Sequence, residues 1–105
     1  MLKHIVVWKF KDHAENADKT ENLLKVKGML ESLKGKIPQI RVFEVAPGNP
    51  GGDLALDLML YSEFEDRDAL LAYQKHPEHV RVAEFIGKVQ MSRAVFDYDS
   101  RGTRG

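Results

Sequence analysis

The chain has no cysteine, no net charge and no long run of apolar residues. Without cysteine it can form no disulfide, no thiolate zinc site and no cysteine-ligated iron–sulfur cluster, and it lacks a thiol nucleophile. Lys and Arg number 16, as do Asp and Glu, so the composition argues against general binding to nucleic-acid phosphates. No apolar stretch approaches the roughly 20 residues of a membrane span. Met1 leads directly into a strand-like segment rather than a signal peptide. We therefore expect a soluble, cytoplasmic protein without a nucleic-acid or membrane partner.

The 105 residues suffice for one domain, and seven segments of it show the periodicity of regular structure. Short β-branched and aromatic runs predict strands, whereas apolar residues at spacings of three and four predict helices. The predicted strands cover 3–11, 39–46, 54–61 and 88–98, and the predicted helices cover 17–34, 66–74 and 77–87.

Local signals support the longest predicted helix, over 17–34. Asn16 or Asp18 can cap its start, and Gly35 marks its end. Gly28 inside it costs about 1 kcal/mol relative to alanine, which indicates a position of close packing.

The order of these segments is β-α-β-β-α-α-β. Short connections and right-handed crossovers then give an α+β fold of the ferredoxin-like type: a four-stranded antiparallel sheet with helices on one face. We expect this domain to span residues 1–98, with a turn-rich hairpin loop at 46–53 and a disordered C-terminal tail at 99–105.

The predicted strands carry apolar residues on both faces, although the helices cover only one. An apolar sheet face of this size is not left in water, so we predict a homodimer that packs sheet against sheet as a barrel. The residues predicted to face the partner are Ile5, Val7, Phe43, Val45, Met59, Tyr61, Phe96 and Tyr98.

The candidate site centres on His79, which falls on the apolar stripe of the helix over 77–87. Tyr73 lies on the inward side of the preceding helix, and His4 shares a strand face with Val6 and Trp8. Two histidines and a tyrosine around an apolar cleft can perform acid/base chemistry. Alternatively, these are buried residues hydrogen-bonded to backbone groups. A ligand-sized cavity lined by Tyr73 and His79 would favour chemistry, and polar atoms tied to backbone in a filled core would favour the structural alternative.

Two further motifs carry weaker signals. His76 and His79 form an H-x-x-H pair, but no third ligand is apparent, and His76 before Pro77 suits a helix cap, so we predict no metal. The glycines at 48–52 lead into a strand rather than a helix and lack the G-K-[ST] of a phosphate loop.

The chain resembles the stress-responsive A/B barrel (Dabb) family in three segments, which are LKHIVVWKFKD (2–12), LLAYQKHPEHV (70–80) and RAVFDYD (93–99). The resemblance covers about residues 2–98 and implies a dimeric ferredoxin-like barrel. Members of the olivetolic acid cyclase type perform an intramolecular aldol condensation. Similarity to them implies a catalytic base at His79, an assisting Tyr73 and a pocket histidine at His4. The chain departs from them at Leu58, where they carry another pocket histidine, so a linear polyketide substrate is not carried over.

The resulting prediction is a homodimer with a small apolar ligand cleft and cofactor-independent, aldol- or cyclase-like acid/base chemistry on a small carbonyl compound. His79 and Tyr73 are the predicted catalytic residues, and His4, Trp8 and Val6 are predicted to bind the substrate, without metal or cofactor. Two alternatives stay open. One is a non-catalytic stress-response or assembly protein, and the other is a cofactor-free monooxygenase-like member of the dimeric α+β barrel group.

Overall fold

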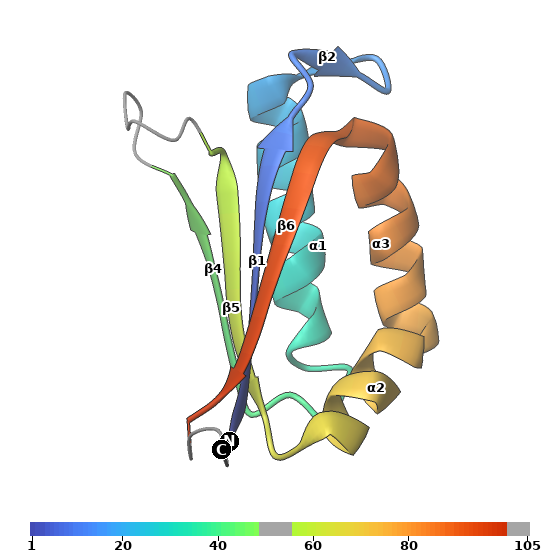
Figure 1. Cartoon of the computed structure of the whole chain (residues 1–105). Helices are drawn as coiled ribbons and strands as arrows, with labels where there is room; N and C mark the ends of the chain where they lie inside the picture. The colour runs from blue at the N-terminus through green and yellow to red at the C-terminus, as the bar shows by residue number, and fades with distance from the viewer. Residues whose placement is uncertain (49–55, 101–105) are drawn as a thin grey trace.

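The computed structural model of the chain describes residues 1–48 and 56–100, and these form a four-stranded antiparallel sheet backed by helices, together with a two-stranded ribbon. The sheet order is β4-β5-β1-β6, with every neighbouring pair antiparallel. Figure 1 shows the helices together on one side of this sheet. The ferredoxin-like prediction is confirmed. The elements are β1 (Leu2–Phe10), β2 (His13–Ala14), β3 (Ala17–Asp18), α1 (Lys19–Leu33), β4 (Val42–Pro47), β5 (Leu58–Phe64), α2 (Arg67–Lys75), α3 (Pro77–Val89) and β6 (Gln90–Asp99).

The start of α1 is fixed by a capping box. Asp18 accepts the backbone N–H of Glu21 at 2.9 Å, and the Glu21 carboxylate accepts the N–H of Asp18 in return. Of the two predicted caps, Asp18 is therefore the correct one. Asn16 instead has a positive φ in the turn of the β2–β3 ribbon, which sequence patterning missed. The buried Asn22 side chain holds this ribbon by donating to the carbonyl oxygen of Ala14 at 2.9 Å.

Strand β1 is the centre of the sheet, and its side chains alternate strictly between buried and half-buried. It pairs with β5 on one side and with β6 on the other. His4, Val6 and Trp8 therefore face the helices, as the sequence predicts, and join the core.

The facing of β4 corrects the sequence prediction. The sequence pattern predicts Phe43 and Val45 on the open face, but Phe43 is buried on the helix side, where its ring lies 6.1 Å from that of Tyr73. The hairpin register sets this orientation, because Phe43 pairs with the buried Ser62 and Val45 with the buried Leu60. The open face of β4 instead presents Val42, Glu44 and Ala46, which are the intervening residues.

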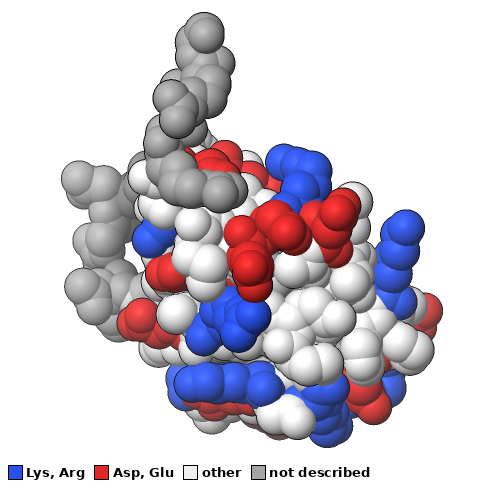
Figure 2. Space-filling view, turned by 90° about the horizontal axis from the view of Figure 1, so that it is seen from below, with Lys and Arg blue, Asp and Glu red and all other residues white. Residues whose placement is uncertain are grey.

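The two ends of the described chain meet at one end of the molecule. Strand β6 continues to Asp99, and the Ser100 N–H donates to the Met1 carbonyl oxygen at 3.1 Å. The first residue of the predicted tail, Asp99, thus belongs to β6, and Ser100 follows it in a turn, while 101–105 and the predicted loop residues 49–53 lie outside the described residues. Acidic and basic side chains are interspersed at this end of the molecule (Figure 2).

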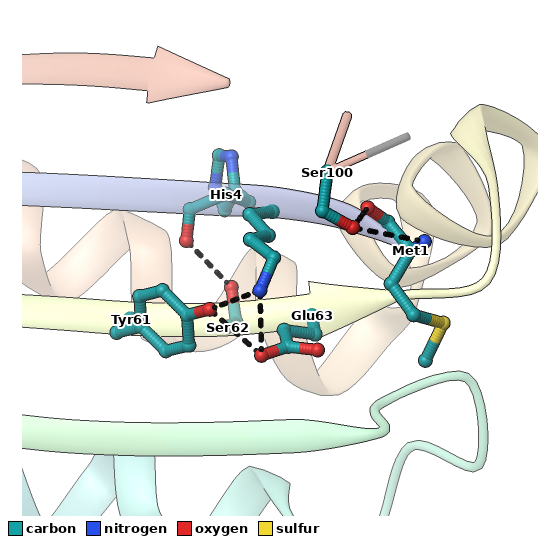
Figure 3. Close-up of polar contacts among 7 residues, drawn as sticks. Met1, His4, Tyr61, Ser62, Glu63 and Ser100 are labelled. Atoms are coloured by element: carbon teal, nitrogen blue, oxygen red, sulfur yellow. Dashed lines mark hydrogen bonds and ion pairs between the residues drawn. The ribbon is translucent and has the colours of Figure 1, made fainter. Parts of the chain in front are cut away.

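The open face of the sheet is apolar over much of its area. Phe96 is 64% exposed and Tyr98 41%, and Ile5, Val7 and Met59 are half-buried beside them. A polar cluster lies on the same face (Figure 3): Lys3 donates to the Tyr61 hydroxyl at 3.0 Å, and that hydroxyl donates to Glu63 at 2.7 Å. The hydrogen bond from Tyr61 is the main cause that lowers the pKa of the Glu63 carboxyl.

Within the described part of the chain, no helix is long and apolar enough to cross a membrane.

The structure does not show the close packing that the sequence predicts at Gly28. A Cβ added at Gly28 would meet no heavy atom within 4 Å, so close packing does not require glycine there. We expect Gly28→Ala to raise the free energy of unfolding by about 0.5–1 kcal/mol, because alanine restricts the unfolded chain and favours the helix. Chemical denaturation at fixed protein concentration measures the change.

Gly48→Ala is the matched control for that substitution. A Cβ at Gly48 would collide with the Leu56 carbonyl oxygen, so this variant should lose stability where Gly28→Ala gains it. Destabilisation by Gly28→Ala would contradict the assignment of Gly28 to an unconstrained helix surface.

Candidate active site

A cavity of about 380 Å³ lies among β1, β6, α2 and α3, a size at the lower end of the range of small-molecule sites. Its wall combines apolar side chains with a few polar groups at separate points. The lining residues are His4, Val6, Trp8, Leu30, Leu60, Tyr73, Gln74, His79, Val82, Ala83, Ile86, Gly87, Gln90 and Arg93. The five residues predicted for the site, His4, Val6, Trp8, Tyr73 and His79, all lie on this wall.

Tyr73 brings the aromatic groups of the site together. It belongs to α2, begun by an Asp66 cap, and is only 1% exposed. Its ring centroid lies 4.5 Å from that of His79 and 6.5 Å from that of His4. Burial raises the pKa of the Tyr73 phenol far above its ordinary value of 10.0. The phenol therefore stays neutral, and its O–H remains available as a hydrogen-bond donor.

His79 is held by one ring nitrogen. Its Nδ1 lies 3.1 Å from the backbone carbonyl oxygen of Gln74, at the end of α2. A carbonyl oxygen only accepts, so Nδ1 carries the proton and Nε2 of the neutral ring keeps its lone pair. Burial is the main cause that lowers the pKa of His79 below 6.5, and the positive charge of Arg93 contributes further. The neutral ring is a base at neutral pH.

His4 is oriented by a carboxylate on the neighbouring strand. Its Nδ1 lies 2.5 Å from Oδ1 of Asp97, which stands directly opposite in the β1–β6 register. Next to His4 in Figure 3, the Ser62 hydroxyl donates to the His4 carbonyl oxygen at 3.0 Å. The His4 ring is thus fixed at the cavity wall by an acidic partner.

Sequence patterning missed three polar residues of the cavity wall, Gln74, Gln90 and Arg93, and the Asp97 partner of His4. Arg93 stands opposite Trp8 in the register, on the helix-facing side of β6. The signal for both charged residues was present in RAVFDYD, where Arg93, Val95 and Asp97 alternate. This alternation alone does not show which face of the strand lines the cavity, because that depends on the residues of β1 that Arg93 and Asp97 pair with.

The remaining histidine of the H-x-x-H pair has a structural position. His76 caps α3, and its Nδ1 accepts the Glu78 backbone N–H at 3.1 Å. Over 1–48 and 56–100, no three His, Cys, Asp or Glu side chains gather in a group that could hold a metal ion.

A second hollow, of about 430 Å³, lies where α2 begins and is lined by Pro38, Gln39, Arg41, Glu65, Asp66 and Ala69. Its charged groups already have partners: Arg41 pairs with Glu65 at 3.0 Å, and Asp66 caps α2. It offers no group poised for chemistry.

Comparison with known proteins identifies related chains. The family model described as "Stress responsive A/B Barrel Domain" (Dabb) matches residues 2–100. An uncharacterised protein of Streptomyces coelicolor is 32% identical over 79 residues, which are 75% of this chain and 79% of that protein.

Solved structures share the fold. A dimeric ferredoxin-like protein of unknown function from Bacteroides fragilis is 36% identical with a TM-score of 0.82, over 93% of this chain and 94% of that one. A hydroxynitrile lyase from Passiflora edulis is 16% identical with a TM-score of 0.73, over 92% and 90%. The second likeness is one of fold alone.

The environment of His79 predicts a measurable titration. Because its pKa is lower in the folded chain than in the unfolded one, protonation favours unfolding. This residue's contribution to stability is thus complete above pH 6.5 and is lost as the pH falls through the lowered value. We expect the His79 ring resonances in NMR, assigned through a His79→Gln variant, to titrate with a midpoint below pH 6.5. In denaturant this midpoint should rise. Titration of the folded chain at or above 6.5 would contradict this account.

Proposed function

The chain belongs to the stress-responsive A/B barrel (Dabb) family, and from this premise we propose that it is a homodimeric enzyme acting by cofactor-independent proton transfer. The substrate is a small carbonyl compound bound in the cavity. The observation that carries the proposal is the pairing of Tyr73 with His79, whose ring centroids lie 4.5 Å apart on the cavity wall.

His79 supplies the base. The Gln74 carbonyl fixes its tautomer, and burial and nearby positive charge keep the ring neutral, so Nε2 can accept a proton from a carbon next to the substrate carbonyl. The electron pair of the broken C–H bond then moves to the carbonyl oxygen and gives an enolate.

Tyr73 stabilises that charge. Its phenol stays protonated and can donate a hydrogen bond to the developing enolate oxygen inside a largely apolar wall, where such a bond is stronger than in water. In an aldol step the enolate carbon attacks a second carbonyl, and the proton on His79 passes to the new alkoxide. His4, Val6 and Trp8 bind the substrate from β1.

A second candidate is a non-catalytic stress-response or assembly protein in which His79 is structural. The hydrogen bond from His79 Nδ1 to the Gln74 carbonyl favours it, because this bond joins α3 to the end of α2. Loss of that bond would leave a carbonyl at the α2 terminus without this partner.

Proton exchange separates the two candidates. In D₂O, we expect the wild-type protein to accelerate loss of the α-proton signal of at least one ketone in a panel of acetylacetone, phenylacetone and benzoylacetone. We expect His79→Gln to abolish this acceleration, a loss of at least about 100-fold for a general base. Proton NMR at pH 7 measures the rates.

His13→Gln is the control, because His13 is exposed on β2 and absent from the cavity wall. It should exchange the ketone protons at the wild-type rate. A rate unchanged in His79→Gln, accompanied by a lowered melting temperature, would overturn the catalytic role in favour of the structural one.

The homodimer is proposed to form through the open sheet face. The support is the apolar surface there, where Phe96 and Tyr98 of β6 lie beside residues of β1. Surfaces of this kind mark subunit contacts, and the Bacteroides fragilis protein is dimeric.

Charge placed on that face tests the contact. Phe96→Glu would bury a carboxylate against apolar surface, so we expect a monomer in light scattering at micromolar concentration. Leu24→Glu is the matched control, because Leu24 is 62% exposed on α1 and Phe96 is 64% exposed. A dimer that survives Phe96→Glu, or one lost equally in Leu24→Glu, would place the contact elsewhere.

A further inference from the structure

Arg93 differs from the other groups on the cavity wall because it carries a permanent charge and has no ion-pair partner among the described residues. It lies on the helix-facing side of β6, opposite Trp8, and lines the cavity. No ion pair or hydrogen bond joins its guanidinium to any residue within 1–48 and 56–100. Arg41 and Arg81, by contrast, each hold a carboxylate at 3.0 Å.

Nothing on the cavity wall neutralises this charge. The described lining residues include no Asp or Glu. The nearest acidic group on the same face of β6 is Asp97, four residues further along and thus about 13 Å away by the strand rise, and it is already bound to His4. Arg93 and His79 line the same cavity, and the charge of Arg93 is one of the smaller causes that lower the pKa of His79.

A guanidinium of this kind is suited to an anion. Its planar array of N–H donors matches a carboxylate in a two-point contact, and Gln90 lies on the same wall with an amide donor. Phosphate sites usually add several backbone N–H groups, commonly from a helix N-terminus. Arg93 instead follows the C-terminal end of α3, which begins at Pro77 and ends at Val89.

We propose that Arg93 binds the carboxylate of the substrate, and that the substrate class is a small carboxylic acid that carries both an apolar body and a carbonyl group. This inference rests on the proposed function for the identity of the cavity as the substrate site. The apolar body packs on Val6, Leu60 and Ile86, and the carbonyl end then lies towards Tyr73 and His79.

The experiment compares acids with their neutral amides. The probes are acetate and acetamide, phenylacetate and phenylacetamide, and octanoate and octanamide, titrated into the ¹⁵N-labelled protein at low salt, with inorganic phosphate as a separate anion. We expect at least one acid to bind in the cavity at least about tenfold more tightly than its amide. Arg93→Gln should remove this preference. Arg93→Lys should keep part of it, because lysine has the positive charge but lacks the planar N–H donors that make a two-point contact.

Arg81→Gln is the matched control. It removes the same charge from α3, which also contributes to the cavity wall, but Arg81 pairs with Glu78 and does not line the cavity. It should keep the wild-type preference for the acid. The inference is overturned if no acid binds more tightly than its amide, if Arg93→Gln keeps the preference, or if phosphate binds through Arg93 more tightly than every acid.

This outcome is separate from that of the proposed chemistry. Binding of the acid is measured without turnover, so a preference that depends on Arg93 supports the inference even if His79→Gln leaves the ketone exchange rate unchanged. Conversely, exchange that depends on His79 without any acid preference would keep the chemistry and overturn the role of Arg93.

Discussion

The candidate site depends on one constraint, the register of β1 between its two neighbours. Because β1 is central, every second residue is forced towards the helices, and this places His4, Val6 and Trp8 on one wall. The same register sets Asp97 opposite His4 and Arg93 opposite Trp8. A slip of one residue would move all of these side chains to the open face. The positions of His4 and Arg93 on the cavity wall are thus fixed by backbone pairing rather than by loops.

The other wall is set by the break between two helices. Pro77 cannot continue α2, and His76 takes an extended conformation at the junction, where it ends α2 and caps α3. The chain therefore turns between Tyr73 and His79, although they are only six residues apart. The turn lets the Gln74 carbonyl reach the His79 ring and brings the two rings into contact. A continuous helix would place residues six apart on largely different faces.

The periodicity of single elements predicts much of this arrangement. It does not show which residues of neighbouring strands pair with one another. The alternation of β1 and the apolar stripe of α3 have strong single-element periods, so the facing of Trp8 and His79 followed from spacing. Strand β4 has apolar residues on both faces, so its period is ambiguous, and only its hydrogen bonds with β5 turn Phe43 inward. Asp97 and Arg93 become site residues through their partners on β1, about 90 positions earlier in the chain. The short β2–β3 ribbon could not be predicted from the sequence, because a two-residue strand is too short to show a period.

The pairing of the first long strand with the last has a consequence for how the protein is made. His4 and Asp97 are separated by 93 positions, and β1 has its final edge partner only once β6 is present. During synthesis, β1 is made before β6. Until β6 has been made, one edge of β1 keeps unpaired backbone N–H and C=O groups. The sheet can therefore be completed only after β6 has been made, and its closure is slowed by the long loop between the two strands. A chain truncated before β6 would lack a cavity wall and also expose the edge most prone to aggregate.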